Sequence, residues 1–462
     1  MTAGKEAAIQ PADEVKDTYD DGILYEEKGG EAPELDEALH VPENNGGPED
    51  EVPALSAVEL YPADKGKRAW LTVVGAFCGQ LASFGYVSSI GVFQEYYRQN
   101  QLKDYTASQI AWISSVHIFL VIFFGVIVGR IYDMFGPKWL LRCGSVFMIV
   151  GVMTTSLCTE YYQIFLSMTV CTALGSSMLF NPSISSVSGW FVRKRATMIG
   201  LTTTGSSLGG VIMPVVFRQV ETRAGYGWAV RSLGFIMLAM VIVCCMTVTS
   251  RVRPQGRQSV HFKDKYVMPF KSIVFVLVTS GIFFTYWGVF VPIGYVATEA
   301  LAHGFSENLS LYLPSILNAA SIFGRIIPGI LADKFGRYNT YIVSAVASCI
   351  LILALWLPAT GHVPIILFSA FYGFFSGTLV SIWPALVADI SPLSDLGARI
   401  GAVSALVSFA SLSGLPIAGA ILAHNNNSYW GVCVFSAICI VSSATVMQLA
   451  RRIYKGGWFV KM

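Results

Sequence analysis

Charged residues are scarce in this sequence. They make up 13% of the 462 residues, and only 12 of the 29 acidic residues lie beyond residue 60. The sequence contains no phosphate-binding glycine loop, catalytic triad or cluster of metal ligands, so it predicts neither an enzyme nor a bound cofactor. The nine cysteines lie in or beside apolar runs without metal-ligand spacing, which argues against a disulfide framework and a structural metal site.

Long apolar runs are the main feature that is present. Hydrophobic residues make up 54% of the chain and its mean hydropathy is +0.57, more than a water-soluble domain needs. We expect twelve membrane-spanning helices, because twelve runs are about 20 residues long, enough to cross ~30 Å of hydrocarbon. The expected spans are 70–93, 110–131, 139–158, 163–189, 196–217, 228–249, 270–296, 310–332, 340–357, 364–388, 399–422 and 429–450. The runs lack the alternation of polar and apolar residues that membrane strands show.

The distribution of basic residues predicts the orientation. The short segments on the amino-terminal side of the membrane hold 22 Lys and Arg residues, against four on the other side: Arg98, Lys103, Arg218 and Arg223. This asymmetry places both termini in the cytoplasm, and we expect a multi-pass protein of the plasma membrane. The basic residues are expected to face anionic lipid headgroups, so they do not indicate a nucleic-acid partner.

The chain ends differ from the apolar middle. The first 60 residues hold 17 acids and three lysines. A segment this acidic and rich in Pro and Gly cannot bury enough apolar surface to fold, so we expect a disordered cytoplasmic tail at 1–66. The other predicted parts are a six-helix half at 67–250, a basic cytoplasmic linker at 251–269, a second six-helix half at 270–450 and a cytoplasmic tail at 451–462.

One short pattern occurs twice, 200 residues apart. The skeleton G-x-x-x-D-x-F-G runs from Gly129 to Gly136 and again from Gly329 to Gly336, and each copy ends a long apolar run. Such a repeat indicates two similar halves. In membrane proteins a duplication of this kind is typical of transporters whose substrate site lies between the halves.

The doubled element resembles the signature of the major facilitator superfamily, over residues 65–455. The first span from Trp70 to Phe77, and the segment from Trp190 through Gly210, resemble the monocarboxylate porter branch. The run from Asn318 to Gly329 resembles fungal members of that branch, which act in uptake or in export of secondary metabolites. The resemblance implies an all-α membrane protein with twelve transmembrane helices in two pseudo-symmetric six-helix halves, working by alternating access.

Arg325 is the most informative single residue. It lies in the middle of the eighth predicted span, where a guanidinium costs ~2.5–3.5 kcal/mol on insertion scales, so it must face a polar cavity or a partner. Its planar fork fits a carboxylate through two parallel hydrogen bonds. In the monocarboxylate porters, the arginine at this motif position binds the substrate's carboxylate. The alternative is a structural arginine satisfied by helix carbonyls.

Proton coupling is less well supported. Animal monocarboxylate carriers place a lysine in the first span and an aspartate one turn before the arginine. The corresponding positions here are Ser88 and Ser321, neither of which titrates near neutral pH. His117, in the second span, is the one intramembrane group with a pKa in range. A proton is therefore a candidate co-substrate through His117, and a hydrogen-bonded packing role for this histidine is the alternative.

Further polar and aromatic residues complete the expected substrate site. Asn181, in the fourth span, offers an amide beside Pro182, and aromatic residues in several spans could line a bulky, partly apolar substrate. Each aromatic taken alone is more consistent with a core or lipid-facing position. The predicted substrate-binding residues are Arg325, Asn318, Ser321, Ser88, Tyr86, His117, Asn181, Tyr286 and Tyr372.

The duplicated element is expected to act as a conformational gate. Asp133 and Asp333 end helices at the inner surface, where a carboxylate can meet a helix amino terminus or a cation. The resemblance pairs Asp133 with the start of helix 11 near Arg399, and Asp333 with the start of helix 5 near Arg193–Arg195. The predicted gate residues are Gly129, Asp133, Gly136, Lys138, Gly329, Asp333, Gly336 and Arg337. The alternative is that these charges only fix topology at the membrane edge.

The sequence therefore predicts a secondary active transporter that moves an organic anion across a membrane. The anion would be a monocarboxylate-type metabolite or a fungal secondary metabolite. The alternative is a membrane sensor that binds a metabolite without transporting it and signals through its acidic tail. The sequence does not specify the substrate, the direction or the oligomeric state.

Overall fold

The computed structural model describes residues 63–256, 263–359, 361–425 and 428–455. The described chain is helical throughout, and its α-helices are α1 (Lys67–Gln99), α2 (Ala107–Phe123), α3 (Gly125–Phe135), α4 (Pro137–Thr155), α5 (Tyr161–Ile164), α6 (Thr172–Trp190), α7 (Arg195–Ala224), α8 (Tyr226–Thr247), α9 (Ile273–Ala302), α10 (Glu307–Phe335), α11 (Arg337–Leu351), α12 (His362–Asp389), α13 (Leu396–His424) and α14 (Trp430–Lys455). Short π or 3₁₀ segments are η2 (Phe165–Cys171), η3 (Lys263–Val267), η4 (Met268–Lys271), η5 (Ile352–Trp356) and η6 (Leu393–Asp395).

The expected spans coincide with these helices. In the described part of the chain, 11 helices are long and apolar enough to cross a membrane. The third expected span, 139–158, falls on α4, a helix of 19 residues that is the one expected span not among the 11. Lys138 and Arg142 in its first two turns lower its hydropathy. α4 nevertheless packs along α6 and α8, and it completes the six expected spans of its half.

Some breaks within the spans do not show in the apolar pattern. The second expected span is interrupted at Phe124, where α2 ends and α3 begins. The fourth contains the π segment η2, and the ninth ends in the π segment η5. Hydropathy reports which residues avoid water and is insensitive to such local changes of helical pitch.

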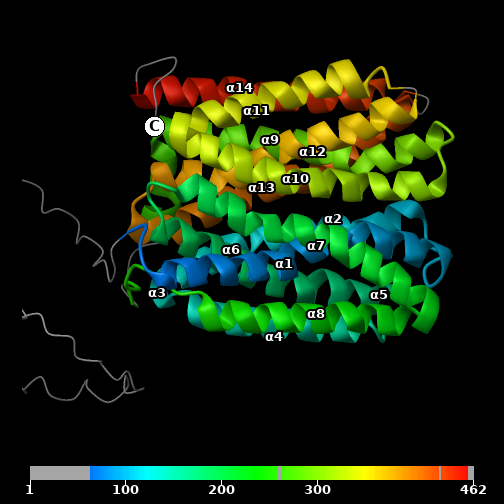
Figure 1. Cartoon of the computed structure of the whole chain (residues 1–462), viewed down its shortest axis with the longest axis horizontal. Coiled ribbons are helices and arrows are strands. Elements are labelled where there is room, and N and C mark those ends of the chain that lie inside the picture. The colour runs from blue at the N-terminus through cyan, green and yellow to red at the C-terminus, as the bar shows by residue number, and fades with distance from the viewer. Residues whose placement is uncertain (1–62, 257–262, 360, 426–427, 456–462) are drawn as a thin grey trace, which may run out of the picture. The chain divides into compact units, whose positions relative to one another are not determined.

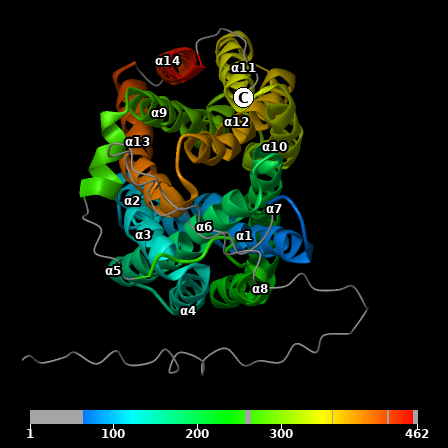
Figure 2. The same cartoon turned by 90° about the vertical axis from the view of Figure 1, so that its left-hand side faces the viewer.

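The helices form two groups. α1 to α8 lie together in one half, and α9 to α14 lie together in the other (Figures 1 and 2). Within the first half α1 packs on α7, α8 and α6; within the second, α9 packs on α14 and α10 on α12. The halves meet where α7 packs on α10 and where α2 and α3 pack on α13.

One contact bears on the expected end of the amino-terminal tail, and the domain boundaries otherwise stay predictions. Residues 1–62 of the predicted tail, and part of the linker and of the carboxyl-terminal tail, lie outside the described residues. Asp64 falls within the expected tail, but it bonds the turn between α6 and α7 through its carboxylate and its backbone N–H. The bundle therefore begins before residue 66.

Candidate functional site

The two copies of the repeated element lie at one end of the bundle. We call this end, where α1 begins and α14 ends, the terminal face. Gly136 and Gly336 have φ angles of +77° and +104°, a region that favours glycine, and each ends a helix so that the next can start at once. Both loops are therefore tight, and the glycine of each copy makes the turn possible.

Asp133 joins the halves at the first copy. It ends α3, it is 6% exposed, and its carboxylate accepts hydrogen bonds from the backbone N–H groups of Gly397 (3.0 Å) and Ala398 (2.7 Å). These N–H groups belong to the first turn of α13 in the other half, where the helix dipole favours a negative charge. The helices approach closely here, since a Cβ added at Gly129 would lie 2.0 Å from the carbonyl oxygen of Gly397.

Asp333 makes the equivalent contact at the second copy. Its carboxylate accepts hydrogen bonds from the N–H groups of Ala196 (3.1 Å) and Thr197 (2.8 Å), and from the Thr197 hydroxyl (2.7 Å). These residues form the first turn of α7. The two aspartates thus cap two helices of the opposite half in the same way, with backbone N–H groups as the principal partners.

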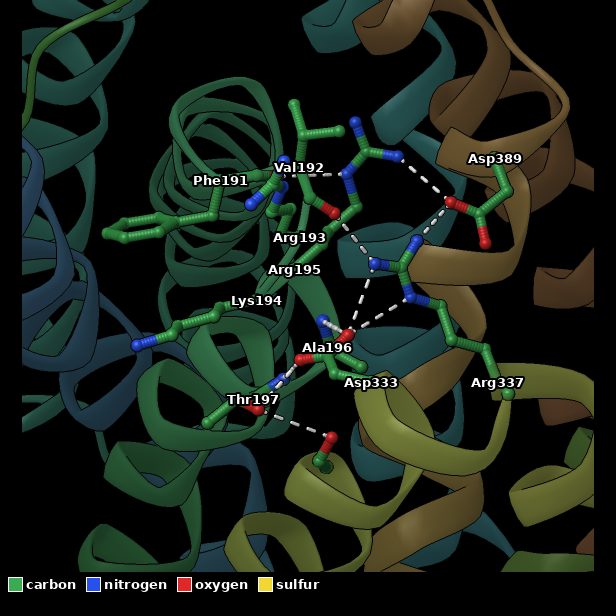
Figure 3. A network of polar contacts seen from close by, with 12 residues as sticks. Phe191, Val192, Arg193, Lys194, Arg195, Ala196, Thr197, Asp333, Arg337 and Asp389 are labelled. Carbon is green, nitrogen blue, oxygen red and sulfur yellow. Dashed lines mark hydrogen bonds and ion pairs between the residues drawn. The ribbon is translucent and has the colours of Figure 1, made fainter. Parts of the chain in front are cut away.

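Charged side chains extend the second contact. Arg195 on α7 pairs with Asp389 at the end of α12 (3.0 Å), and Arg337 bonds both Asp389 and Asp333. Arg337 also donates to the carbonyl of Val192 across the halves (2.8 Å). Figure 3 shows how the two arginines and two aspartates converge on the α6–α7 turn. Such a mostly buried network is costly to separate, because each charge would have to find water or a new partner.

Arg325 and Gly125 occupy equivalent places in the two halves. Each lies eight residues, about 12 Å, before the aspartate of its copy. A Cβ added at Gly200 would lie 2.2 Å from the Arg325 carbonyl oxygen, and one at Gly401 would lie 2.3 Å from that of Gly125. The same backbone contact thus occurs twice, but only the second half has a cationic side chain, Arg325, at this position.

The Arg325 side chain lies between α10 and α7. It is 9% exposed, and its Nη1 donates to the carbonyl of Thr203 and to the hydroxyl of Ser206. Its Nε is buried and has no hydrogen-bond partner among the described residues. None of the ion pairs of the described residues includes Arg325. The guanidinium is therefore held by neutral groups on one side only.

Ser321 and Asn318 lie next to Arg325 on α10. The Ser321 hydroxyl bonds that of Ser207 on α7 (2.6 Å), which ties the halves together one turn from the arginine. A Cβ added at Gly210 would lie 2.9 Å from the Asn318 amide nitrogen and 2.8 Å from the Ser88 Cβ. Ser88 is exposed, and its hydroxyl donates to the Phe84 carbonyl within α1. Four predicted residues thus gather along the α7–α10 contact.

Tyr86 and His117 lie elsewhere, inside the first half. Both are fully buried, with ring centres 6.2 Å apart. His117 Nδ1 lies 2.9 Å from the Met168 carbonyl in η2, while its Nε2 and the Tyr86 hydroxyl have no partner in the described part of the chain. The π turn diverts the Thr172 N–H to the Ser167 carbonyl, and the Met168 carbonyl then lies against both His117 Nδ1 and the Thr172 hydroxyl, which donates to it. This placement favours the packing alternative for His117.

The remaining predicted residues divide between the two halves. Asn181 lies against Gly125, with both amide atoms 3.1 Å from a Cβ added there, and its Oδ1 has no described partner. Tyr286 packs on Trp383 (6.3 Å) and lies close enough to Arg325 to interact electrostatically. Tyr372 donates to the Val289 carbonyl (3.0 Å) within its own half, which indicates a packing role.

Comparison with known proteins agrees with this architecture. A family model described as Major Facilitator Superfamily matches residues 72–361 and 278–455. The chain belongs to the major facilitator superfamily. It is 40% identical to the MFS transporter asaE of Aspergillus flavus over 93% of this chain and 94% of that protein. It is also 40% identical to the Fujikurins efflux protein of Gibberella fujikuroi, over 87% and 86% of the two chains. Among solved structures, the E. coli fucose:proton symporter FucP superposes with a TM-score of 0.68 at 14% identity, covering 83% of this chain and 98% of that one.

Family membership decides between the two functions that the sequence left open. The matching proteins are transporters, so this chain is a multi-pass membrane transporter rather than a metabolite sensor. The predicted all-α fold is likewise confirmed. The monocarboxylate branch, the substrate and the roles of single residues stay predictions.

Several residues of the transporter are not apparent from the sequence. Glu299 lies beyond the expected end of the seventh span at 296; it is 3% exposed inside α9 and accepts a hydrogen bond from Trp356. Asp389 directly follows the expected span 364–388, but the sequence does not predict its ion pairs with Arg195 and Arg337. Asp133 meets the start of α13 beside Arg399, whose own side chain donates to the Ile390 carbonyl. Lys138 is exposed.

Proposed function

We propose that this superfamily member exports an organic monoanion, of the secondary-metabolite kind, by alternating access between its two halves. The terminal face is the cytoplasmic one by the distribution of basic residues, at the plasma membrane. The contacts of Asp133, Asp333 and Asp389 then close the cytoplasmic side, so the structure corresponds to a state that is closed toward the cytoplasm. The names of similar fungal proteins, which include efflux proteins, support the direction.

Arg325 is the observation on which the substrate class rests. A guanidinium buried in a membrane bundle normally pairs with an acid or faces a water-filled cavity. Here Nη1 is held by Thr203 and Ser206, and none of the described acids forms an ion pair with the side chain. The missing counter-charge is the carboxylate of the substrate.

The two bonds to α7 also fix how a carboxylate would be received. They hold the guanidinium by Nη1, which leaves the edge formed by Nε and Nη2. That edge is one of the two that bind a carboxylate through parallel hydrogen bonds. Since Thr203 and Ser206 orient the guanidinium beforehand, little side-chain entropy is lost on binding. The structural role and the binding role of Arg325 are therefore compatible.

The equivalent position in the first half limits the charge of the substrate. Where the second half has Arg325, the first has Gly125 with the neutral amide of Asn181 beside it. Asn181 Oδ1 is buried and unpaired among the described residues, so it can accept a hydrogen bond from a hydroxyl or amide group. A molecule with one carboxylate and one neutral donor fits this pair, which agrees with the monocarboxylate porter branch.

The test uses organic acids paired with their methyl esters. Purified full-length protein would be heated in detergent with each acid and its ester, and an acid that raises the Tm would then be used, isotope-labelled, in counterflow into liposomes. We expect acids to stabilise and esters not to. Arg325→Ala should lose both stabilisation and flux, and Arg325→Lys should recover little, because an ammonium cannot reproduce the fork.

Arg231→Ala is the matched control, since Arg231 is also an intramembrane arginine but lies on α8, bonded to Ser156 within the first half. It should keep acid binding. Equal binding of acids and esters, or normal flux by the alanine variant of Arg325, would refute the anion site. Stabilisation without counterflow would contradict the transport step.

A further inference from the structure

Asp64 lies just before α1 in an uncommon conformation. Its φ is +59°, and it is the one non-glycine residue with positive φ in the described ranges. Its carboxylate accepts hydrogen bonds from three consecutive backbone N–H groups, those of Val192 (3.2 Å), Arg193 (3.2 Å) and Lys194 (3.4 Å). Its own N–H donates to the carbonyl of Trp190 (3.0 Å). Asp64 thus binds the whole α6–α7 turn.

The same turn carries the contact of Asp333. Two N–H groups a little further along the chain, those of Ala196 and Thr197, donate to Asp333 of the other half. Two carboxylates therefore bind neighbouring N–H groups of one turn. Asp64 belongs to the same half as the turn, whereas Asp333 must leave it when the halves separate.

The N–H groups of the turn have little other support. Arg195 Nε donates to the carbonyls of Ser188 and Phe191, and Arg337 donates to that of Val192, so these arginines hold carbonyl groups of the turn. Lys194 at the cap position of α7 provides no side-chain cap for the N–H groups. A free helix amino terminus leaves such donors unsatisfied. Without Asp64, the first turn of α7 would fray, and Asp333 would have to order it again each time the face closes.

We propose that Asp64 is a positioning residue for the Asp333 contact: it keeps the α6–α7 turn in the shape that Asp333 binds, and so favours closure of the terminal face. The inference rests on the proposed gating role of this face. It extends that role to a residue outside both copies of the repeat, on the segment that links the acidic tail to the bundle.

The experiment measures the conformation directly and needs no substrate. Nitroxide labels at Trp139 and Ile453, exposed positions on the terminal face of different halves, would report the distance between the halves by pulsed electron spin resonance. The full chain would be used, with its native cysteines replaced by serine. Asp64→Gly removes the carboxylate yet adopts a positive φ without strain, and Asp64→Asn keeps one acceptor oxygen.

We expect the open fraction to rise about five- to tenfold with Asp64→Gly and less with Asp64→Asn. The decisive result is the coupling. In an Asp333→Asn background, where the contact between Asp333 and the turn is already impaired, Asp64→Gly should raise the open fraction by less than a further twofold. In an Asp133→Asn background, where the Asp333 contact is intact, it should add its full effect. Asp104→Asn, an exposed aspartate near the opposite face, is the matched control and should change nothing.

A purely local stabilising role for Asp64 would lower the Tm without this pattern. The inference is overturned if Asp64→Gly leaves the distances unchanged, or if its effect is equally large in both aspartate backgrounds. Should Asp64→Gly fail to fold, Asp64→Asn carries the same test. The spin-label experiment uses no substrate, so its result can be interpreted even if the counterflow assay refutes the anion site. The counterflow assay can likewise be interpreted even if Asp64 proves to have no role in closure.

Discussion

Replacing Asp133 by asparagine is the cleanest test of the gate. The Asp133 carboxylate accepts one hydrogen bond on each oxygen, from Gly397 and from Ala398, and both bonds cross between the halves. An asparagine side chain has one acceptor oxygen, and its amide group would point N–H toward N–H at the other position. One inter-half bond is therefore lost, together with the charge that favours the start of α13.

The structure sets the size of the effect. A hydrogen bond to a charged group contributes about 1.5–3 kcal/mol, and the remaining neutral bond keeps part of this. Only contacts that differ between the closed and open states shift the equilibrium. We therefore expect Asp133→Asn to favour opening of the terminal face by about 1–2 kcal/mol, roughly a five- to thirtyfold change in population.

Spin-label distances across the terminal face, together with acid binding and turnover, check this expectation. The open fraction should rise, the acid should still bind, and turnover should fall because the closed state is reached less often. Asp333→Asn should act in the same direction, since Asp333 caps α7 as Asp133 caps α13. If either variant lost acid binding while its distances stayed unchanged, the gating assignment would be wrong. A change of orientation in the membrane would instead favour the topology alternative.

Three further predictions concern packing and the tail. Gly200→Ala should separate α7 from α10 and raise the open fraction, because its Cβ would meet a backbone carbonyl at 2.2 Å; Gly91→Ala, with nothing within 4 Å, should not. Trp356→Phe should lower the Tm by several degrees, since it leaves the buried Glu299 carboxylate without its donor, a loss of about 1–3 kcal/mol. Deleting residues 2–60 should leave flux per surface molecule unchanged, and a large loss would contradict the view that the tail is dispensable.

The positions of the helices could be predicted because membrane insertion depends on composition over about 20 residues. Apolar runs report this directly, and every expected span falls on a helix or on consecutive helical segments, with ends that differ by up to seven residues. The break at Phe124 and the π segments could not be predicted, because they depend on how a helix fits its neighbours. The seventh span also continues six residues past its expected end, since α9 stays buried against other helices up to Ala300 and ends at Ala302. Glu299 lies in that extension.

The gate could be located from the sequence but its partners only in part. The repeat identified Asp133 and Asp333, and the resemblance gave the helices they meet. The sequence left a helix amino terminus and a cation as alternative partners, and in the structure both aspartates bond backbone N–H groups. Arg195 does take part, but its partner Asp389 comes from a helix almost 200 residues away. Such a meeting of distant segments is set by tertiary packing.

The repeat itself held one signal that bears on the substrate. An offset of 200 residues places Gly125 opposite Arg325, and the two share the same helix contact at the same depth. A duplicated frame with a single cation can neutralise one carboxylate only. A second carboxylate would lie near Gly125 and the neutral Asn181 amide, and an unpaired buried charge costs several kcal/mol.

Dicarboxylates should therefore bind at least tenfold more weakly than monocarboxylates of the same length, as a Tm series would measure. Gly125→Arg would not reverse this preference, because the added side chain would clash with Asn181 and Ser404, each within 3.1 Å of its Cβ. Equal binding of both acid classes would mean that a second cation, in addition to Arg325, faces the substrate.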